Sequence, residues 1–138
     1  MLYDAIIMSV IVISVVDDMF FASKIRAVAE AASVEISFPR SQEAVVSKAR
    51  ETKPGLIVVD LHNQKIDPVA LAQELKADDE LRHIKLLGFF SHVQTELQRN
   101  ALAAGFDRVI PRSLFARDLP KILTAAKNYN TDTGAITS

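Results

Sequence analysis

Residues 5–18 read AIIMSVIVISVVDD, an apolar run that ends in two aspartates. The run is too short for a spanning helix, which needs roughly 20 apolar residues, and it lacks the basic start of a signal peptide. Because Val10 to Val16 is rich in β-branched residues, it is typical of a strand buried on both faces. Met8 is an alternative start, so residues 1–7 are interpreted as an N-terminal extension.

Further apolar runs of strand length follow, and a helical pattern comes after each of them. The predicted strands cover Val34 to Phe38, Leu56 to Val59, Ile84 to Phe90 and Arg108 to Pro111. The predicted helices lie near 20–32, 42–52 and 68–78, along the stripe from Val93 to Ala104, and after Asp118. Capping residues support these helices: Ser41, Asp67 before Pro68, and Asp118 at N-termini, and Gly105 at a C-terminus.

Strands that alternate with helices of this length indicate βαβ units and a mainly parallel sheet. Five such units predict an α/β fold of the flavodoxin-like (βα)5 type, a sandwich whose five parallel strands lie in the order 2-1-3-4-5. Another small α/β sandwich is the alternative. One domain over residues 8–128 is expected, followed by a flexible polar tail at 129–138.

Composition excludes several classes of protein. The chain has 138 residues, no Cys, and 16 Lys plus Arg against 17 Asp plus Glu, for a net charge of −1. A disulfide framework and a thiolate metal site are therefore ruled out, and a reducing, cytoplasmic setting is expected. A nearly neutral chain also lacks the broad basic field of a nucleic-acid binder. No direct nucleic-acid partner and no membrane partner are expected.

Three carboxylates follow the two strands at the centre of the predicted sheet. Open parallel sheets bind ligands beyond the carboxyl ends of their strands, at the point where the strand order reverses. Asp17 and Asp18 end the first strand and Asp60 ends the third. Carboxylates at about 4 Å repel by about 1 kcal/mol in water, and Mg²⁺ would relieve that repulsion. Alternatively, Asp17 and Asp18 only cap the next helix and Asp60 is a solvated loop acid.

Three sequence patterns together resemble the receiver domain of bacterial response regulators, of the CheY-like kind. They are VVDD at 15–18, VVD at 58–60 and AAGFDRVIPRSLF at 103–115. The resemblance extends from about Val10 to Ala126, which is most of the chain.

The resemblance implies a set of roles for the acidic residues. Asp60 would accept a phosphoryl group from a partner histidine kinase or phosphotransfer protein. Asp17 and Asp18 would help to hold Mg²⁺, with Asp18 the more direct ligand. His62 would offer its backbone carbonyl to the metal; an exposed loop histidine is the alternative for its side chain.

Other positions depart from the family pattern and indicate an atypical receiver. The usual Thr or Ser after the fourth strand falls on Phe90, or on Ser91 if the register shifts by one residue. The usual Lys is replaced by Arg112, which either serves the same site or neutralises Asp60 and holds the pocket in one state. The usual aromatic switch position falls on Val109, which has no ring to rotate.

The sequence is compatible with two functional hypotheses. In the first, the chain is a stand-alone receiver of a two-component phosphorelay that signals to a downstream protein, with a homodimer through the fourth and fifth helices. In the second, it is a pseudo-receiver, an interaction module that phosphorylation does not switch. An enzyme is not expected, because no glycine-rich phosphate loop follows the first strand and the histidines lie on separate loops.

Overall fold

The computed structural model describes residues 10–137, and the side chains of residues 10–128. The strands are β1 (Val10–Val15), β2 (Val34–Ser37), β3 (Leu56–Asp60), β4 (Lys85–Phe90) and β5 (Arg108–Pro111). The helices are α2 (Met19–Ala31), α3 (Gln42–Thr52), α4 (Pro68–Ala77), α5 (Thr95–Ala104) and α6 (Arg112–Thr137). The predicted extension at residues 1–7 lies outside the described residues, and the domain limits at 8 and 128 stay predictions.

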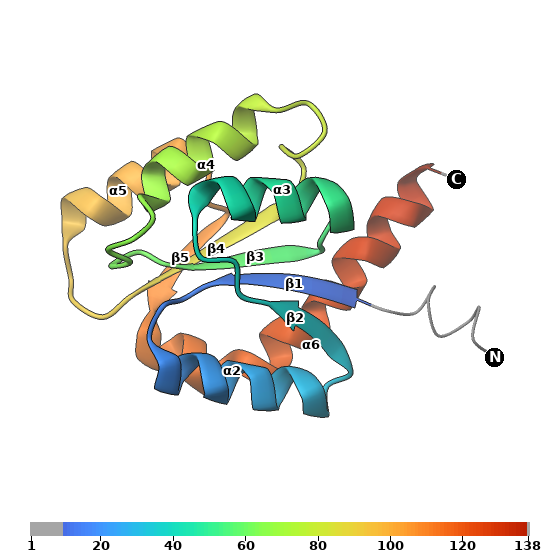
Figure 1. The fold of residues 1–138 in the computed structure, drawn as a ribbon, viewed down its shortest axis with the longest axis horizontal. Helices are drawn as coiled ribbons and strands as arrows, with labels where there is room; N and C mark the ends of the chain where they lie inside the picture. The colour runs from blue at the N-terminus through green and yellow to red at the C-terminus, as the bar shows by residue number, and fades with distance from the viewer. Residues whose placement is uncertain (1–9, 138) are drawn as a thin grey trace.

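The strands form one parallel sheet in the order β2-β1-β3-β4-β5, which confirms the predicted flavodoxin-like topology. Helices α2 and α6 cover one face of the sheet, and α3, α4 and α5 cover the other (Figure 1). Val15 pairs with Val59 in the β1–β3 ladder, so these two strands end side by side. The residues that follow them are therefore neighbours at one edge of the sheet.

The sheet divides the apolar interior into two layers of buried side chains. Strands β1 and β3 contribute to both layers, because successive residues of a strand point to opposite faces. Ile13 and Ile57 face α3 and α4, whereas Val12 and Val58 face α2 and α6. All four side chains are 0% exposed, as expected for central strands of a sheet covered on both faces.

Local capping explains where several helices begin and end. The side chains of Asp18, Ser41 and Asp67 accept hydrogen bonds from the backbone N–H groups of the first turns of α2, α3 and α4. These bonds confirm the predicted caps at Ser41 and Asp67. Gly105 ends α5 with a φ of 123°, a backbone conformation that favours glycine.

Two predicted features at the C-terminal half of the chain were wrong. Asp118 does not begin the last helix, because α6 starts at Arg112, directly after β5, and Asp118 lies within it. Phe115 and Leu119 already face the core at a spacing of one helical turn, and Pro120 is tolerated inside α6 on its exposed side. Val93 is not part of the buried stripe of α5: it precedes the helix and is 78% exposed.

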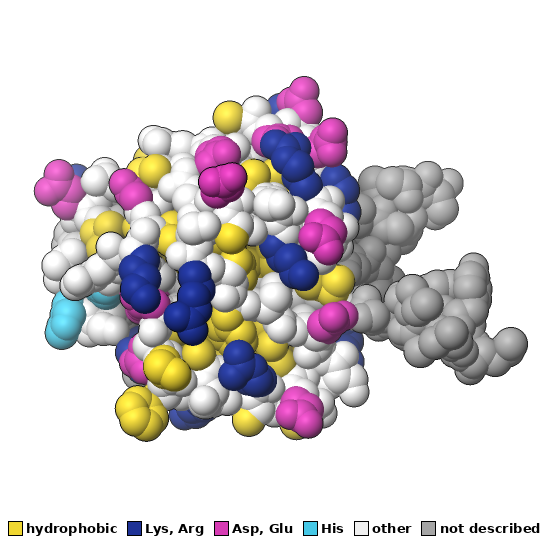
Figure 2. All heavy atoms as spheres, in the orientation of Figure 1, with side chains coloured by type: hydrophobic (Ala, Val, Ile, Leu, Met, Phe, Trp, Pro, Cys, Tyr) yellow, Lys and Arg dark blue, Asp and Glu magenta, His cyan; other side chains and the backbone are white. Residues whose placement is uncertain are grey.

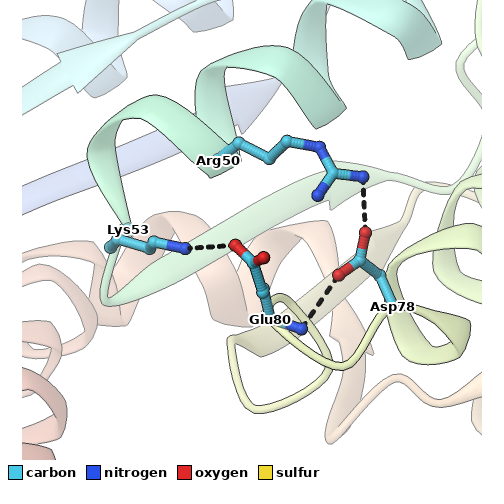
Figure 3. Close-up of polar contacts among 4 residues, drawn as sticks. All are labelled: Arg50, Lys53, Asp78 and Glu80. Carbon is cyan, nitrogen blue, oxygen red and sulfur yellow. Dashed lines mark hydrogen bonds and ion pairs between the residues drawn. The ribbon is translucent and has the colours of Figure 1, made fainter.

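Ion pairs join the end of α3 to the loop between α4 and β4 (Figure 3). Arg50 contacts the carboxylate of Asp78, and Lys53 contacts Glu80 at 3.2 Å. The other carboxylate oxygen of Asp78 accepts a hydrogen bond from the backbone N–H of Glu80 at 2.9 Å. Within the described part of the chain, no helix has the length and apolarity to cross a membrane.

Candidate functional site

The carboxyl ends of β1 and β3 bring the three predicted acids to one edge of the sheet. Asp60 is the last residue of β3, and Asp17 and Asp18 form the turn between β1 and α2. Asp60 is buried, with 8% of its surface exposed, whereas Asp18 is half-buried and Asp17 is exposed. The negative charge of Asp17 also acts on Asp60 and raises the pKa of the Asp60 carboxyl.

Asp60 is a buried carboxylate with one anchored oxygen. Its Oδ1 accepts a hydrogen bond from the backbone N–H of His62 at 2.9 Å. Burial raises the pKa of Asp60, and the His62 N–H opposes part of this rise because it stabilises the charged form. Among the described residues, no donor reaches Oδ2 within hydrogen-bond distance. One oxygen is therefore held in place and the other is available for chemistry.

Asp18 has two structural partners at the start of α2. Its Oδ1 accepts hydrogen bonds from the backbone N–H groups of Phe20 and Phe21, at 3.0 and 3.1 Å. Its Oδ2 lies 3.3 Å from a guanidinium nitrogen of Arg112. The Phe21 N–H and the Arg112 guanidinium hold the pKa of Asp18 below its ordinary value. Asp18 thus caps α2, as one sequence interpretation expected, and also carries an ion pair.

Arg112 is the first residue of α6, and its side chain extends to the carboxylate of Asp18. Its guanidinium carbon lies 4.0 Å from the centre of the Phe21 ring, a cation–π geometry. The sequence left open whether Arg112 would neutralise Asp60. Its ion pair in the structure is with Asp18, and its charge lowers the pKa of Asp60 only as a lesser influence, behind burial and His62.

The acids have the right chemistry for Mg²⁺, because carboxylate and carbonyl oxygens are the ligands that this ion prefers. Their placement is less favourable. In the described region, no three His, Cys, Asp or Glu side chains are grouped closely enough to hold a metal ion. The Oδ2 atom of Asp18 is also occupied by Arg112. The donor types suit Mg²⁺, but the described side chains are not grouped around it, and Arg112 is paired with Asp18.

Phe90 and Ser91 are the two candidates for the position after β4 where the family pattern has a Thr or Ser. Phe90 ends β4 at 8% exposed and packs into the core on the α4 and α5 side. Ser91 follows it, exposed, and lines the same shallow hollow as Arg112. Val109 on β5 is partly buried against the same core as Phe90. Of Phe90, Ser91 and Val109, only Ser91 carries a hydroxyl group, and Ser113 lines the same hollow.

Two further residues shape the loop after β3 and were missed by the sequence analysis. The Oδ1 atom of Asn63 accepts hydrogen bonds from the N–H groups of Lys65 and Ile66, both at 2.9 Å, and its Nδ2 donates to the carbonyl of Val15 at 3.4 Å. His92 packs against His62 with ring centres 5.6 Å apart. An Asn shortly after a strand end signals such an Asx turn; no local signal pairs the two histidines.

The chain is similar in sequence to response regulators, although no family model matches it. It is 30% identical over 93 residues to the response regulator protein VraR of Staphylococcus saprophyticus, covering 67% of this chain and 43% of that protein. It is 35% identical over 79 residues to VraR of Staphylococcus aureus, covering 57% of this chain and 37% of that protein. The chain spans less than half the length of these curated relatives.

Solved structures show the same fold at low sequence identity. A CheY-like receiver domain from Methanospirillum hungatei superposes with a TM-score of 0.74 at 17% identity, over 89% of this chain and 98% of that one. The receiver domain of a sensor histidine kinase from Pseudomonas aeruginosa superposes with a TM-score of 0.75 at 16% identity, over 87% and 98%. That structure is described with a magnesium ion in its active site cleft.

The sheet order and the acids at the ends of β1 and β3 define a receiver-type α/β domain. Together with the similarity to response regulators, they show that the chain has the fold of a CheY-like receiver domain. This confirms the resemblance on which the sequence interpretation depended.

Proposed function

We propose that Asp60 is a phosphoacceptor and that the chain works as a phosphorylation-dependent signalling receiver. The observation that supports this is the burial of the Asp60 carboxyl at the ligand-binding edge of the sheet. Among the described residues, Asp60 is the only charged side chain classed as buried. Burying a carboxylate is costly, and a stability role alone gives no reason to retain it.

The proposed step is a direct transfer to the available oxygen of Asp60. This oxygen attacks phosphorus, an O–P bond forms, and the bond between phosphorus and the donor breaks with its electron pair on the leaving group. The backbone N–H of His62 keeps the carboxylate oriented during the attack. The Ser91 hydroxyl, rather than Phe90, supplies a hydrogen bond to the phosphoryl oxygens, and the Arg112 guanidinium supplies positive charge.

Mg²⁺ belongs to this proposal as an assisting ion. Asp17, Asp18 and Asp60 would hold it together with the backbone carbonyl of His62. When bound, it would offset the negative charge that gathers as a phosphoryl group approaches these acids. Because Arg112 occupies Asp18, Arg112 and Mg²⁺ compete for one carboxylate.

A pseudo-receiver is the second candidate function, and one observation favours it directly. Arg112 bridges α6 to Asp18 and lies over the ring of Phe21, so the site already contains its own counterion. In that case the acids hold the strand ends in one arrangement and no phosphoryl group is exchanged. The surface of α5, β5 and α6 would then bind a partner without a switch.

The partners follow from the same proposal. A histidine kinase or phosphotransfer protein would supply the phosphoryl group, and a downstream protein would read the surface of α5, β5 and α6. A homodimer through α5 and α6 and a cytoplasmic location remain part of this proposal.

Phosphorylation in vitro tests the proposal. The chain is incubated with Mg²⁺ and acetyl phosphate, and intact mass spectrometry measures a hydroxylamine-labile phosphoryl adduct. We expect an adduct that Asp60→Asn abolishes and that Asp79→Asn retains, since the Asp79 side chain is 87% exposed. An adduct that survives in Asp60→Asn refutes the assignment of Asp60. No adduct, under conditions that label an ordinary receiver, favours the pseudo-receiver.

A further inference from the structure

A second concave region lies beside the acidic site and shares Asp17 with it. It is formed by the turn between β1 and α2, the first turns of α2, and the loops that follow β2 and β3. All three strands end here, so the pocket is at the edge of the sheet where doubly wound folds bind ligands. The acceptor Asp60 and the hydroxyl of Ser91 are not among its lining residues.

The interior of this pocket is apolar and held in shape. Val16 and Ile66 are buried, and Phe38, which also lines the pocket, is half-buried. The N–H of Ile66 is tied to the side chain of Asn63, which also donates to the end of β1. The loop after β3 is thus fixed by hydrogen bonds before any ligand arrives, so little ordering is needed on binding.

Three cations surround this apolar interior. Arg26 comes from α2, Arg40 from the loop after β2, and Lys65 from the loop after β3. In the part of the chain that the structure describes, no carboxylate lies within ion-pair distance of any of them. Arg26 is held over the ring of Phe38, with its guanidinium carbon 4.7 Å from the ring centre. Asp17 is the only acid in the lining.

We propose that this pocket binds a small organic anion, a phosphate, phosphonate or carboxylate attached to an apolar ring or chain. The apolar interior around Val16, Phe38 and Ile66 takes the apolar body. The three cations take the negative group, and Figure 2 shows Lys and Arg side chains around hydrophobic ones on the face that it draws. A metal ion is disfavoured, because cations dominate the rim. A nucleic acid is disfavoured by the net charge of −1.

The pocket and the acidic site share one wall. Asp17 lines the pocket and its charge also acts on the carboxyl of Asp60. Binding itself does not depend on the proposed phosphotransfer, so we expect it to persist in Asp60→Asn.

The test uses three small probes and NMR spectroscopy of the ¹⁵N-labelled chain. Phenylphosphonate carries both an anion and a ring and has no phosphoryl group to transfer. Inorganic phosphate carries only the charge, and benzyl alcohol carries only the ring. We expect saturable amide shifts with phenylphosphonate at residues 38, 40, 41 and 63–66, in the wild type and in Asp60→Asn, and weaker binding of the other two probes.

A variant of one of the three cations tests whether their charge contributes to binding. We expect Arg40→Gln to weaken phenylphosphonate binding about two-fold to five-fold, the effect of losing one exposed charge contact. Arg99→Gln, on exposed α5, is the matched control and should leave the affinity unchanged.

Four results would overturn the proposal. They are no saturable shifts with phenylphosphonate, equal binding of inorganic phosphate (an adventitious ion only), equal binding of benzyl alcohol, and an equal loss in Arg99→Gln. Acetyl phosphate labelling of Asp60 is measured separately, so either proposal can fail while the other stands.

Discussion

Replacing Phe115 with alanine is expected to destabilise the fold more than any exposed substitution near the site. Phe115 is 0% exposed at the start of α6. Its ring stacks on Phe89 of β4 with centres 4.7 Å apart and contacts the edge of Phe21 of α2 at 5.9 Å. Phe21 in turn supports the guanidinium of Arg112. The ring therefore joins α6, β4 and α2 directly beneath the candidate site.

The magnitude follows from burial and from the ring contacts. Truncating a fully buried Phe to Ala costs about 3–5 kcal/mol, within the total stability of about 5–15 kcal/mol of such domains. Unfolding entropy is about 2.1 cal/mol/K per residue. For 138 residues, each kcal/mol then corresponds to about 3–4 °C, and Tm should fall by about 10–17 °C.

Thermal and urea unfolding followed by circular dichroism measure this loss. Phe115→Leu keeps a buried apolar side chain without the stacked ring and should lose about 1–2 kcal/mol. Phe20→Ala is the matched control, because Phe20 is 92% exposed and its loss should change stability by no more than about 0.5 kcal/mol. A Phe115→Ala variant within about 1 kcal/mol of the wild type would refute the reasoning.

Three more substitutions test other parts of the structure through unfolding. Gly88→Ala should lose about 1–3 kcal/mol in urea, because a Cβ there would lie 2.9 Å from the Leu61 side chain; an unchanged midpoint would contradict this. Burial raises the pKa of Asp60 in the folded protein, so the stability that the protonated carboxyl contributes is lost as pH rises through that folded-state pKa. Asp60→Asn should therefore have a higher Tm than the wild type at pH 7. The two Tm values should converge below pH 3.8, the ordinary pKa of the carboxyl. The Glu80 N–H lowers the pKa of Asp78, so the stability that the ionised Asp78 carboxylate contributes is lost as pH falls. Asp78→Asn should therefore have a lower Tm than the wild type at pH 7, and a Tm difference that persists in acid would exclude the charge of Asp78 as its cause.

Local patterns were sufficient to predict most of the fold. Apolar runs of strand length and helical spacing predicted the five βα units and their order. Ser41 and Asp67 cap the helices that the sequence assigned to them, because an N-cap bond is made within three residues. The predicted start of α6 was wrong, because it relied on Asp118 as a cap and ignored the spacing of Phe115 and Leu119. Both side chains are buried in the core from the first turns of the helix.

The sequence by itself determined which residues meet at the edge of the sheet. The acids directly follow the apolar runs of β1 and β3, and parallel pairing brings the ends of those strands together. The tertiary structure alone decided how those acids are used. Arg112 reaches Asp18 across 94 positions of the chain because α6 packs beside α2. No pattern within a segment encodes such a contact, which depends on how two helices pack on the same face of the sheet.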